Sequence, residues 1–222
     1  MYGGRTWFAF RSFGHGLVRL LARACLKVDV HGMENFPRSG PLLVVINHLG
    51  DADVPSLIAS LPIAPDAIGK IELYDLPVLG RLMDWYGMIW VHRGQADTRA
   101  LRAALDGLAE GRIIIIAPEG RYSLTGALEE GTGGAAFLAY KSGAPVLPIA
   151  ITGTENEKVY GAMKRLRRAN VTVRAGRVFH LDTSARKRQE VVALGTRQIM
   201  QSLAALLPGE YRGTYSNDLS NL

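Results

Sequence analysis

The stretch NHLGDAD, residues 47–53, combines a histidine with two aspartates at a spacing that could support proton transfer. It follows the apolar run PLLVVI and precedes VPSLIASL, which are typical of a buried strand and of a helix. A turn of four residues between His48 and Asp53 can fold back so that the carboxylate contacts the imidazole. An imidazole oriented in this way, with its other nitrogen facing a crevice, is a general base. Two plainer interpretations stay open: Asp53 or Asp51 caps the helix, and His48 is a buried histidine with satisfied hydrogen bonds.

Arginine side chains occur at the ends of two later apolar runs. Arg93 ends GMIWVHR, and Arg121 follows Glu119 and Gly120 in IIIIAPEGRYS, where the proline and the glycine make the turn tight. A guanidinium presents a fixed fork of donors that suits a phosphate group. Together with the histidine–aspartate pair, these arginines predict a site that activates a hydroxyl group of a phosphorylated molecule.

Short apolar runs rich in β-branched residues recur along the chain and are typical of strands covered on both faces of a sheet. They are LLVVI (42–46), GMIWV (87–91), RIIIIA (112–117), VLPIAI (146–151) and VTVRA (171–175). Pro148 lies inside the fourth run. Because proline cannot donate to a ladder, this strand is predicted to lie at an edge of the sheet or to contain a bulge.

Helical patterns lie between these runs. In DTRALRAALDGLAEG, residues 97–111, the leucines share one face, Asp97 can cap the start and Gly111 the end. A second helix is predicted over residues 133–143 and a third over residues 185–206. The alternation predicts a single α/β domain with a central, mostly parallel or mixed sheet flanked by helices. Its chemistry is expected at the carboxyl ends of the strands.

The composition limits the class of protein. Of 222 residues, 48% are hydrophobic and 21% are charged, which is typical of one globular domain and not of a disordered or polytopic chain. Cys25 is the single cysteine, which excludes an internal disulfide and a thiolate metal cluster. The net charge of +6 predicts an anionic partner: nucleic acid, a phosphorylated metabolite or an anionic membrane.

The first residues form a distinct segment that is basic and rich in aromatic and leucine side chains. Arginines interrupt it too often for a transmembrane helix, and no uninterrupted apolar core leads to a cleavage site. We expect an amphipathic segment, broken into two helical pieces at Gly14 and Gly16, that docks on a membrane. The alternative is a helix packed on the domain with its arginines in water. The predicted boundaries are 1–31 for this segment, 32–207 for the globular domain and 208–222 for a loose polar tail.

Four stretches, in this order, resemble the motif set of the glycerolipid acyltransferases, the family of 1-acyl-glycerol-3-phosphate O-acyltransferase. They are NHLGDAD, with Asn-His, four residues and Asp, then GMIWVHR, PEGRYS and PVLPI. The intervening KIELYDLPVLG also resembles a segment of that family. The resemblance runs from about Gly32 to Ile151, more than half of the chain, and four motifs in order make it specific.

The resemblance implies transfer of an acyl group from a thioester, acyl-CoA or acyl-carrier protein, to the hydroxyl of a lysophospholipid such as 1-acyl-glycerol-3-phosphate, in phospholipid synthesis or remodelling. It assigns roles to seven residues: His48 as general base, Asp53 as the group that orients it, Arg93, Arg121 and a candidate third, Lys70, as phosphate-binding groups, and Glu119 and Gly120 as residues that shape the acceptor site. The thioester is a co-substrate, so no cofactor and no metal ion is expected. Backbone N–H groups of the same turns would stabilise the oxyanion.

This chain departs from the family's pattern in the third motif. Where PEGTRS is common, PEGRYS has Arg121 in the threonine position and Tyr122 in the arginine position, and Glu130 stands where a lysine is often found. The variant resembles members that act on acceptors other than lysophosphatidic acid, so the headgroup stays open. The alternatives are acylation of a different lipid or glycolipid by the same mechanism, and a non-catalytic basic lipid-binding relative.

Two other functional classes fit less well. A serine hydrolase would need a G-x-S-x-G elbow, which the chain lacks. KRLRR, residues 164–168, is a basic cluster without an accompanying nucleic-acid-binding motif, so no nucleic-acid partner is expected. The basic N-terminus and a membrane-resident acceptor predict a peripheral or monotopic protein on the cytoplasmic face of a membrane, with anionic lipid as its partner.

Overall fold

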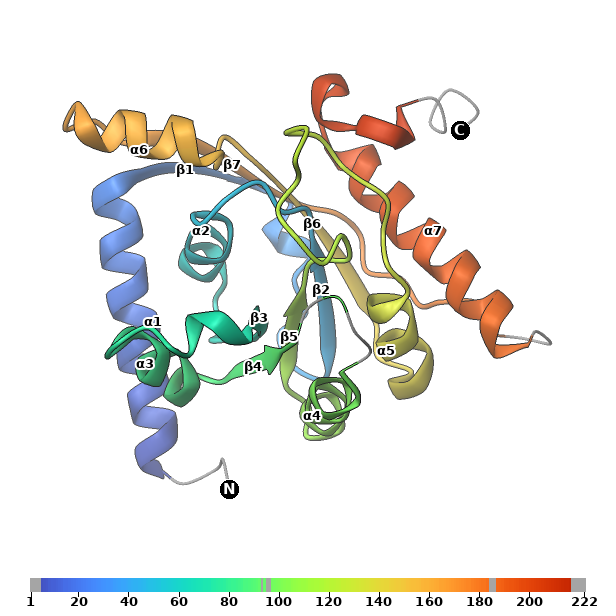
Figure 1. Cartoon of the computed structure of the whole chain (residues 1–222). Helices are drawn as coiled ribbons and strands as arrows, with labels where there is room; N and C mark the ends of the chain where they lie inside the picture. Colours follow the sequence, from blue (N-terminus) through green and yellow to red (C-terminus); the bar gives the residue numbers. More distant parts are fainter. Residues whose placement is uncertain (1–4, 93, 95–96, 184–186, 217–222) are drawn as a thin grey trace.

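The computed structural model describes residues 5–92, 94, 97–183 and 187–216. Its centre is a seven-stranded sheet with the strand order β1-β7-β6-β2-β5-β3-β4 (Figure 1). Neighbouring strands are parallel, except that β6 and β7 are antiparallel. The strands are β1 (Leu26–His31), β2 (Leu42–Ile46), β3 (Asp66–Lys70), β4 (Met88–Val91), β5 (Ile113–Ile116), β6 (Val146–Thr152) and β7 (Ala169–Ala175). The predicted α/β domain with a mostly parallel, mixed sheet is confirmed.

Seven α-helices lie in the described ranges: α1 (Arg5–Cys25), α2 (Asp53–Ser60), α3 (Leu79–Tyr86), α4 (Thr98–Ala109), α5 (Gly134–Ser142), α6 (Asn156–Lys164) and α7 (Arg188–Leu206). The three predicted helices correspond to α4, α5 and α7. Asp97 caps α4 as expected, because its carboxylate accepts a hydrogen bond from the backbone N–H of Ala100. Residues 185 and 186 of the third predicted helix lie outside the described residues.

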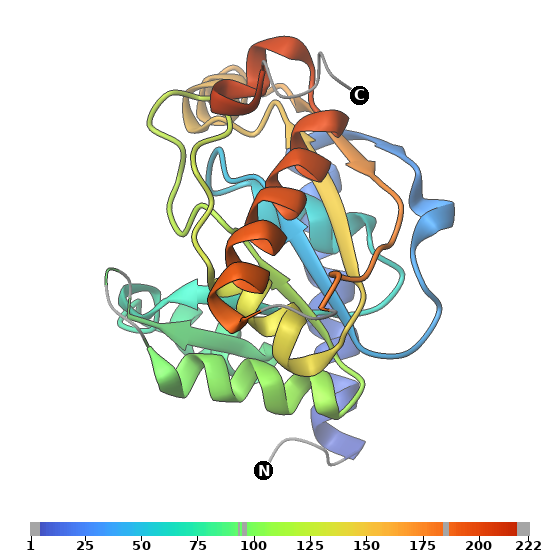
Figure 2. The same ribbon diagram turned by 90° about the vertical axis from the view of Figure 1, so that its right-hand side faces the viewer.

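Helices cover both faces of the sheet. Buried residues of α4, α5 and α7 pack with β2, β5 and β6 in one apolar cluster, and α1 and α2 pack on the opposite face in a second cluster. Figure 2 looks onto α7 and α5, which lie in front of the sheet in that view. Every residue of β2 is buried, so the strand that leads to His48 is held from both sides.

Two strands were missed by the sequence analysis, and each lacks a continuous apolar run. β1 (LKVDVH) lies at an edge of the sheet, and most of its residues are at least partly exposed. β3 (DAIGK) contains an aspartate and a glycine, which are both unfavourable in isolated strands. Their pairing with β7 and with β4 and β5 therefore depends on tertiary contacts.

The predicted edge position of Pro148 is wrong, because β6 pairs with β2 on one side and with β7 on the other. Val146 pairs with Phe179 and Ile149 pairs with Ala175. Between these two pairs, the chain advances three residues in β6 but four in the segment opposite. The segment after β7 therefore contains one extra residue, which is the defining feature of a β-bulge. It falls where the proline has no N–H to donate, so the second of the two sequence interpretations fits the structure.

The N-terminal segment is one helix followed by a strand, not two helical pieces. α1 continues through Gly14 and Gly16, and residues 26–31 form β1. No helix of the described residues is long and apolar enough to cross a membrane.

α1 turns its polar side toward the protein. Arg11, His15 and Arg19, spaced four residues apart, bind the carbonyl oxygens of Ala64, Leu61 and Ala59 respectively. These carbonyls belong to the last turn of α2 and the residues after it, where a helix leaves acceptors unsatisfied. Four large apolar side chains of α1 are instead exposed, those of Phe13, Leu17, Leu20 and Leu21, and Arg23 near the end of the helix is exposed as well. The interpretation that placed the arginines in water is wrong for Arg11, which is buried, and Arg19 is half-buried.

The first part of the predicted loose tail is ordered. The 3-10 turns Gly209–Tyr211 and Gly213–Tyr215 follow α7. Tyr211 makes two of the contacts that hold this segment. Its backbone carbonyl accepts a hydrogen bond from the backbone N–H of Leu128, and its side-chain hydroxyl donates one to Glu155. Residues 217–222 lie outside the described residues.

Candidate active site

His48 follows the carboxyl end of β2, and Asp53, the first residue of α2, turns back toward it. The Oδ2 atom of Asp53 lies 2.7 Å from Nδ1 of His48 and accepts hydrogen bonds from the backbone N–H groups of Leu49 and Gly50, at 2.7 and 2.9 Å. Because this oxygen already accepts two N–H groups, the proton shared with the imidazole is assigned to Nδ1. The predicted contact between His48 and Asp53 is present.

Neither aspartate of the loop caps α2. The N-cap position is Ala52, and no side-chain hydrogen bond caps the helix. Asp53 is fully buried within the loop that it closes, and Asp51 binds two tyrosines, described below. The capping interpretation of either residue is therefore wrong.

The second imidazole nitrogen of His48 is open. The residue is 8% exposed, and within the described part of the chain no hydrogen bond involves Nε2. Nε2 is also not among the buried atoms of these residues that lack a partner, so it reaches solvent. An imidazole held by a carboxylate through Nδ1, with Nε2 open at the end of a strand, can take a proton from a bound hydroxyl.

Glu119 clamps the loop that carries the histidine. Its Oε1 accepts the backbone N–H of His48 and its Oε2 accepts that of Glu129, both at 2.9 Å. Burial raises the pKa of Glu119 to about 7, although the two hydrogen bonds act in the opposite direction. Gly120 follows with a φ of 72°, in the left-handed region that glycine adopts without strain, so the chain can turn directly after the glutamate.

Asn47 is a positioning residue that the sequence analysis did not single out. Its side-chain amide donates to the carbonyl of Ile151 at 2.8 Å and accepts the backbone N–H of the same residue at 2.7 Å. These bonds extend the pairing of β2 with β6 by one residue beyond the end of β2. Its place directly before His48, at the end of an apolar run, was the available signal.

The three predicted phosphate-binding residues differ in their surroundings. Arg121 is more than half exposed, and its Nε and Nη2 atoms both bind Oε2 of Glu129, at 3.1 and 2.8 Å. Lys70 ends β3, and its charge acts on Asp51. Arg93 lies outside the described residues. Among the described candidates, the structure therefore places Asp53 and Glu119 in contact with His48, whereas Arg121 pairs with Glu129.

A tyrosine–aspartate network lies beside the imidazole and was also missed. The ring of Tyr122 meets the ring of His48 edge to face, with centroids 4.2 Å apart. Its hydroxyl donates to Oδ1 of Asp51 at 2.6 Å, and the hydroxyl of Tyr160 donates to Oδ2 at 2.7 Å. The unusual residue of the PEGRYS motif thus contacts the candidate base.

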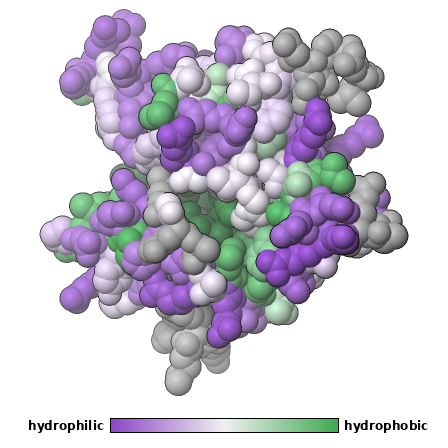
Figure 3. Space-filling model, turned by 45° about the vertical axis from the view of Figure 1, so that its right-hand side comes forward, coloured by the Kyte–Doolittle hydropathy of each residue, from purple (hydrophilic) through white to green (hydrophobic). Residues whose placement is uncertain are grey.

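The surface of the molecule is hollowed on the side shown in Figure 3. The hollow has an apolar interior, and residues of intermediate hydropathy lie along its upper edge. An apolar hollow on this face could hold a hydrocarbon chain.

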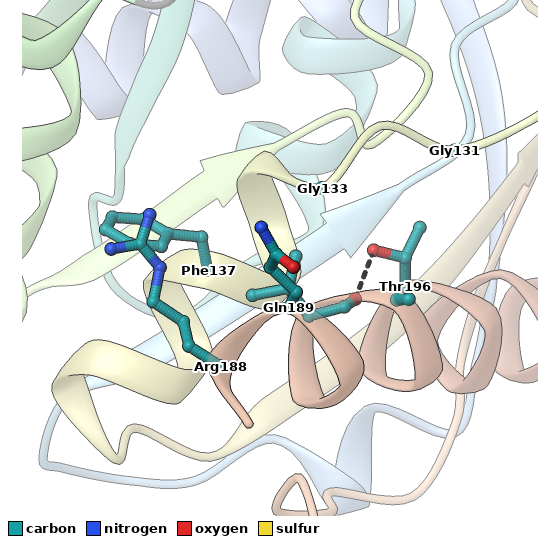
Figure 4. A pocket seen from close by; sticks show the side chains of 8 residues that line it. Gly131, Gly133, Phe137, Arg188, Gln189 and Thr196 are labelled. Carbon is teal, nitrogen blue, oxygen red and sulfur yellow. Dashed lines mark hydrogen bonds between the residues drawn. The ribbon is translucent and has the colours of Figure 1, made fainter. Parts of the chain in front are cut away.

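A second cavity, of about 470 Å³, lies between α5 and α7. Figure 4 shows Phe137 of α5 and Arg188 of α7 side by side at this cavity, and the guanidinium lies 5.3 Å from the ring centroid. None of its lining residues is among the candidate site residues. Among the residues that the structure describes, no group of three or more His, Cys, Asp or Glu is placed to hold a metal ion.

The chain is similar to known acyltransferases. Residues 27–152 match the profile of a family described as Acyltransferase. The chain is 31% identical over 151 residues to the chloroplastic 1-acyl-sn-glycerol-3-phosphate acyltransferase BAT2 of Brassica napus, a match that covers 65% of this chain and 44% of that protein. It is 33% identical over 137 residues to the lyso-ornithine lipid O-acyltransferase of Pseudomonas aeruginosa, covering 61% and 51%.

The fold is similar to that of the 1-acyl-sn-glycerophosphate (LPA) acyltransferase PlsC from Thermotoga maritima. The TM-score is 0.67 at 22% sequence identity, and the match covers 88% of this chain and 81% of that one. The chain spans about half the length of the curated relatives it matches.

Proposed function

Because this chain belongs to the Acyltransferase family, we propose that it transfers a fatty acyl group from an acyl thioester to the free hydroxyl of a lysophospholipid. The observation that carries the proposal is the geometry of His48, with Nδ1 held 2.7 Å from Asp53 and Nε2 open at the end of β2. Relatives named as 1-acyl-sn-glycerol-3-phosphate acyltransferases support the same reaction.

His48 and Asp53 can support this transfer by general-base catalysis. Nε2 of His48 removes the proton of the acceptor hydroxyl while the hydroxyl oxygen attacks the thioester carbonyl carbon. The carbonyl electron pair moves onto its oxygen, and backbone N–H groups would stabilise the resulting oxyanion. Collapse of this intermediate restores the carbonyl and expels the thiolate, which takes the proton back from the imidazolium. Asp53 holds the Nδ1–H throughout and stabilises the transient positive charge.

Both acyl-CoA and acyl-carrier protein fit this mechanism as donors, because each presents the acyl group as a thioester. The apolar hollow in Figure 3 suits the acyl chain. Arg121, Arg93 and Lys70 stay our candidates for the acceptor's phosphate. Arg121 could bind a phosphate in place of its present partner, since the ion pair with Glu129 is exposed and therefore weak.

Incubation of the purified chain with labelled acyl donors and a panel of lysolipids tests the proposal. We expect a labelled diacyl product with at least one donor and one acceptor. A folded protein that forms no such product from any pair would contradict it.

A second candidate function is acylation, by the same mechanism, of an acceptor other than lysophosphatidic acid. The observation that favours it is Tyr122 in the position that the family often fills with arginine, together with the engagement of Arg121 by Glu129. One relative is named for a lyso-ornithine lipid acceptor.

We further propose that the protein works on a membrane surface, because the proposed acceptor resides in a bilayer. The outward face of α1 supports this. Phe13, Leu20 and Leu21 are 70%, 66% and 57% exposed, and they stand on the same side of the helix. Apolar side chains gathered on one face of a helix are typical of insertion into the interface of a membrane.

α3 extends this apolar face. It packs against α1, and Trp85 of α3 meets Phe10 of α1 edge to face with ring centroids 5.6 Å apart. Val78, Leu79, Leu82 and Trp85 are themselves exposed at or in α3. We call the exposed apolar residues of α1 and α3 the docking face.

A basic turn lies at the end of α1. Nη1 of Arg168 binds the carbonyl of Arg23 at 3.4 Å, so residues 164–168 adjoin the C-terminal end of the helix. Within this turn Leu166 is 98% exposed between two arginines. Cations beside an apolar face favour binding to an anionic bilayer. Because the cytoplasmic leaflet is the anionic one, we assign the protein to the cytoplasmic face of the membrane.

Vesicle flotation tests this docking. In Phe13→Ser/Leu20→Ser we expect binding to anionic vesicles to fall, whereas Leu194→Ser, which removes an exposed leucine of α7, should leave it unchanged. Arg165→Glu/Arg167→Glu should weaken binding to anionic vesicles and reduce its salt dependence. If the serine pair binds vesicles as the parent does but separates a dimer into monomers, the docking face covers a second copy of the chain.

A further inference from the structure

Asp51, Tyr122 and Tyr160 come from three segments and meet beside the candidate base. Asp51 lies in the loop after β2, Tyr122 in the loop after β5 and Tyr160 in α6. Each oxygen of the carboxylate accepts one phenol hydroxyl, and the backbone N–H of Asp51 donates to the side-chain oxygen of Asn156 at 2.9 Å. Asp51 stays exposed, so a ligand can still reach it.

The carboxylate is close to the place of reaction. The Tyr122 ring spans the gap between the His48 ring, 4.2 Å away, and the Asp51 carboxylate, which its hydroxyl binds. A lysolipid whose hydroxyl lies at Nε2 of His48 would therefore place its headgroup within reach of this network.

Asp51 carries a negative charge at neutral pH. Its partial burial acts to raise its pKa, but the hydrogen bonds from Tyr122, Tyr160 and Asn156 and the charge of Lys70 outweigh this and hold the pKa below the usual value. A dianionic phosphate monoester would be repelled by this carboxylate. A positively charged nitrogen would be attracted by it and by the faces of the two phenol rings.

We propose that Asp51, Tyr122 and Tyr160 bind the cationic nitrogen of the acceptor's headgroup, so that the preferred acceptor is an amine-bearing lysolipid. The proposal rests on the acyl transfer proposed above and names its acceptor class. Lys70, at the carboxyl end of β3, is the partner for the anionic part of such a headgroup.

The test compares two acceptors that share a phosphodiester and an acyl chain. Lysophosphatidylethanolamine ends in an ammonium group, and lysophosphatidylglycerol ends in neutral hydroxyls. With a saturating labelled acyl donor, we expect kcat/KM to be about tenfold higher for the amine acceptor, as one charge-assisted contact of about 1.4 kcal/mol would give.

Asp51→Asn keeps an oxygen that can accept hydrogen bonds but removes the charge. It should abolish the preference for the amine acceptor by lowering that kcat/KM about tenfold, with a far smaller change for the glycerol acceptor. Asp106→Asn, which removes an exposed charge on α4, is the matched control and should preserve the preference. Tyr122→Arg should shift the preference toward lysophosphatidic acid, because it replaces a phenol beside His48 with a cation.

Three results separate the possible failures. Equal loss for both acceptors in Asp51→Asn would show that the network only ties the three segments together and would overturn the proposal. A parent protein that prefers lysophosphatidic acid would also overturn it while leaving acyl transfer intact. A folded parent that acylates no lysolipid of the wider panel used to test acyl transfer, with any donor, would reject the acyl transfer itself.

Discussion

His48 and His15 are equally buried, each 8% exposed, yet they are held in different ways. Nδ1 of His15 lies 3.4 Å from the Tyr86 hydroxyl, and its Nε2 lies 3.2 Å from the Leu61 carbonyl. His48 uses one nitrogen, for Asp53, and leaves the other open. Burial therefore does not distinguish the two histidines, whereas the unused nitrogen of His48 at a strand end does, and for that reason we propose His48 as the base.

The two buried carboxylates repeat this contrast. Asp53 and Asp66 are both fully buried. Asp66 stands between the guanidinium groups of Arg11 and Arg112, so charges of opposite sign meet inside the protein. Asp53 faces an imidazole and two backbone N–H groups. The first arrangement joins α1 to the sheet, and the second fixes the orientation of the His48 imidazole, the base in our proposal.

The largest expected effect is the loss of activity on replacement of His48. His48→Ala should lower the rate of acyl transfer by about 10²- to 10⁴-fold, because a positioned general base is lost. The variant should still fold, with a free energy of unfolding lower by about 1–3 kcal/mol because the buried Asp53 loses its bond to the imidazole. Turnover near that of the parent would remove the proposed mechanism.

Replacement of Asp66, the carboxylate between the two arginines, should lower the stability of the protein. Asp66→Ala removes the buried carboxylate that pairs with both Arg11 and Arg112, so we expect the free energy of unfolding to fall by about 3–5 kcal/mol. Chemical denaturation of the purified variant measures this. Asp53→Asn is the comparison: it should lower turnover, less severely than His48→Ala, and a larger loss of stability than in Asp66→Ala would reverse our assignment of the two carboxylates.

Glu119, which holds the loop that carries His48, should make the stability of the protein depend on pH. Its pKa is raised from 4.5 to about 7 by burial, so between these values the folded protein binds a proton that the unfolded chain has released. The free energy of unfolding should therefore fall as the pH rises from about 4.5 to about 7, by at most about 3 kcal/mol.

Glu119→Gln cannot titrate and should remove this part of the pH dependence. The variant is expected to be less stable at every pH, because its amide cannot accept both backbone N–H groups. The slope of stability against pH is thus the measurement, and an unchanged slope would assign the titration to another group.

The smallest expected effect is on the satisfied histidine. His15→Ala leaves the carbonyl of Leu61 without this partner, which should cost about 1–3 kcal/mol of stability. The turnover of the folded variant should equal that of the parent. A loss of turnover as large as that of His48→Ala would show that the two histidines are not separable in this way.

The patterns that the sequence analysis used were local ones. Five strands were visible because each contains an apolar run, although only β2, β5 and β6 are buried almost throughout. α4 was visible because Asp97 and the leucine spacing mark it. β1 and β3 were not visible, since the first is largely exposed at an edge and the second contains an aspartate, a glycine and a lysine among its five residues. Pro148 was misplaced because its neighbours tolerate it through a bulge that involves residues far along the chain.

The sequence by itself determined the histidine–aspartate contact, because only four residues separate the two and both follow one strand. It also contained the ordered motifs of the family. Tertiary structure alone decided which side of α1 faces outward, because the carbonyls at the end of α2 draw in the arginines and the histidine. It likewise decided that Arg121 pairs with Glu129 and that Tyr122 reaches both His48 and Asp51. A spacing in sequence limits which neighbours can meet, but the direction of a side chain depends on partners that the fold brings from elsewhere.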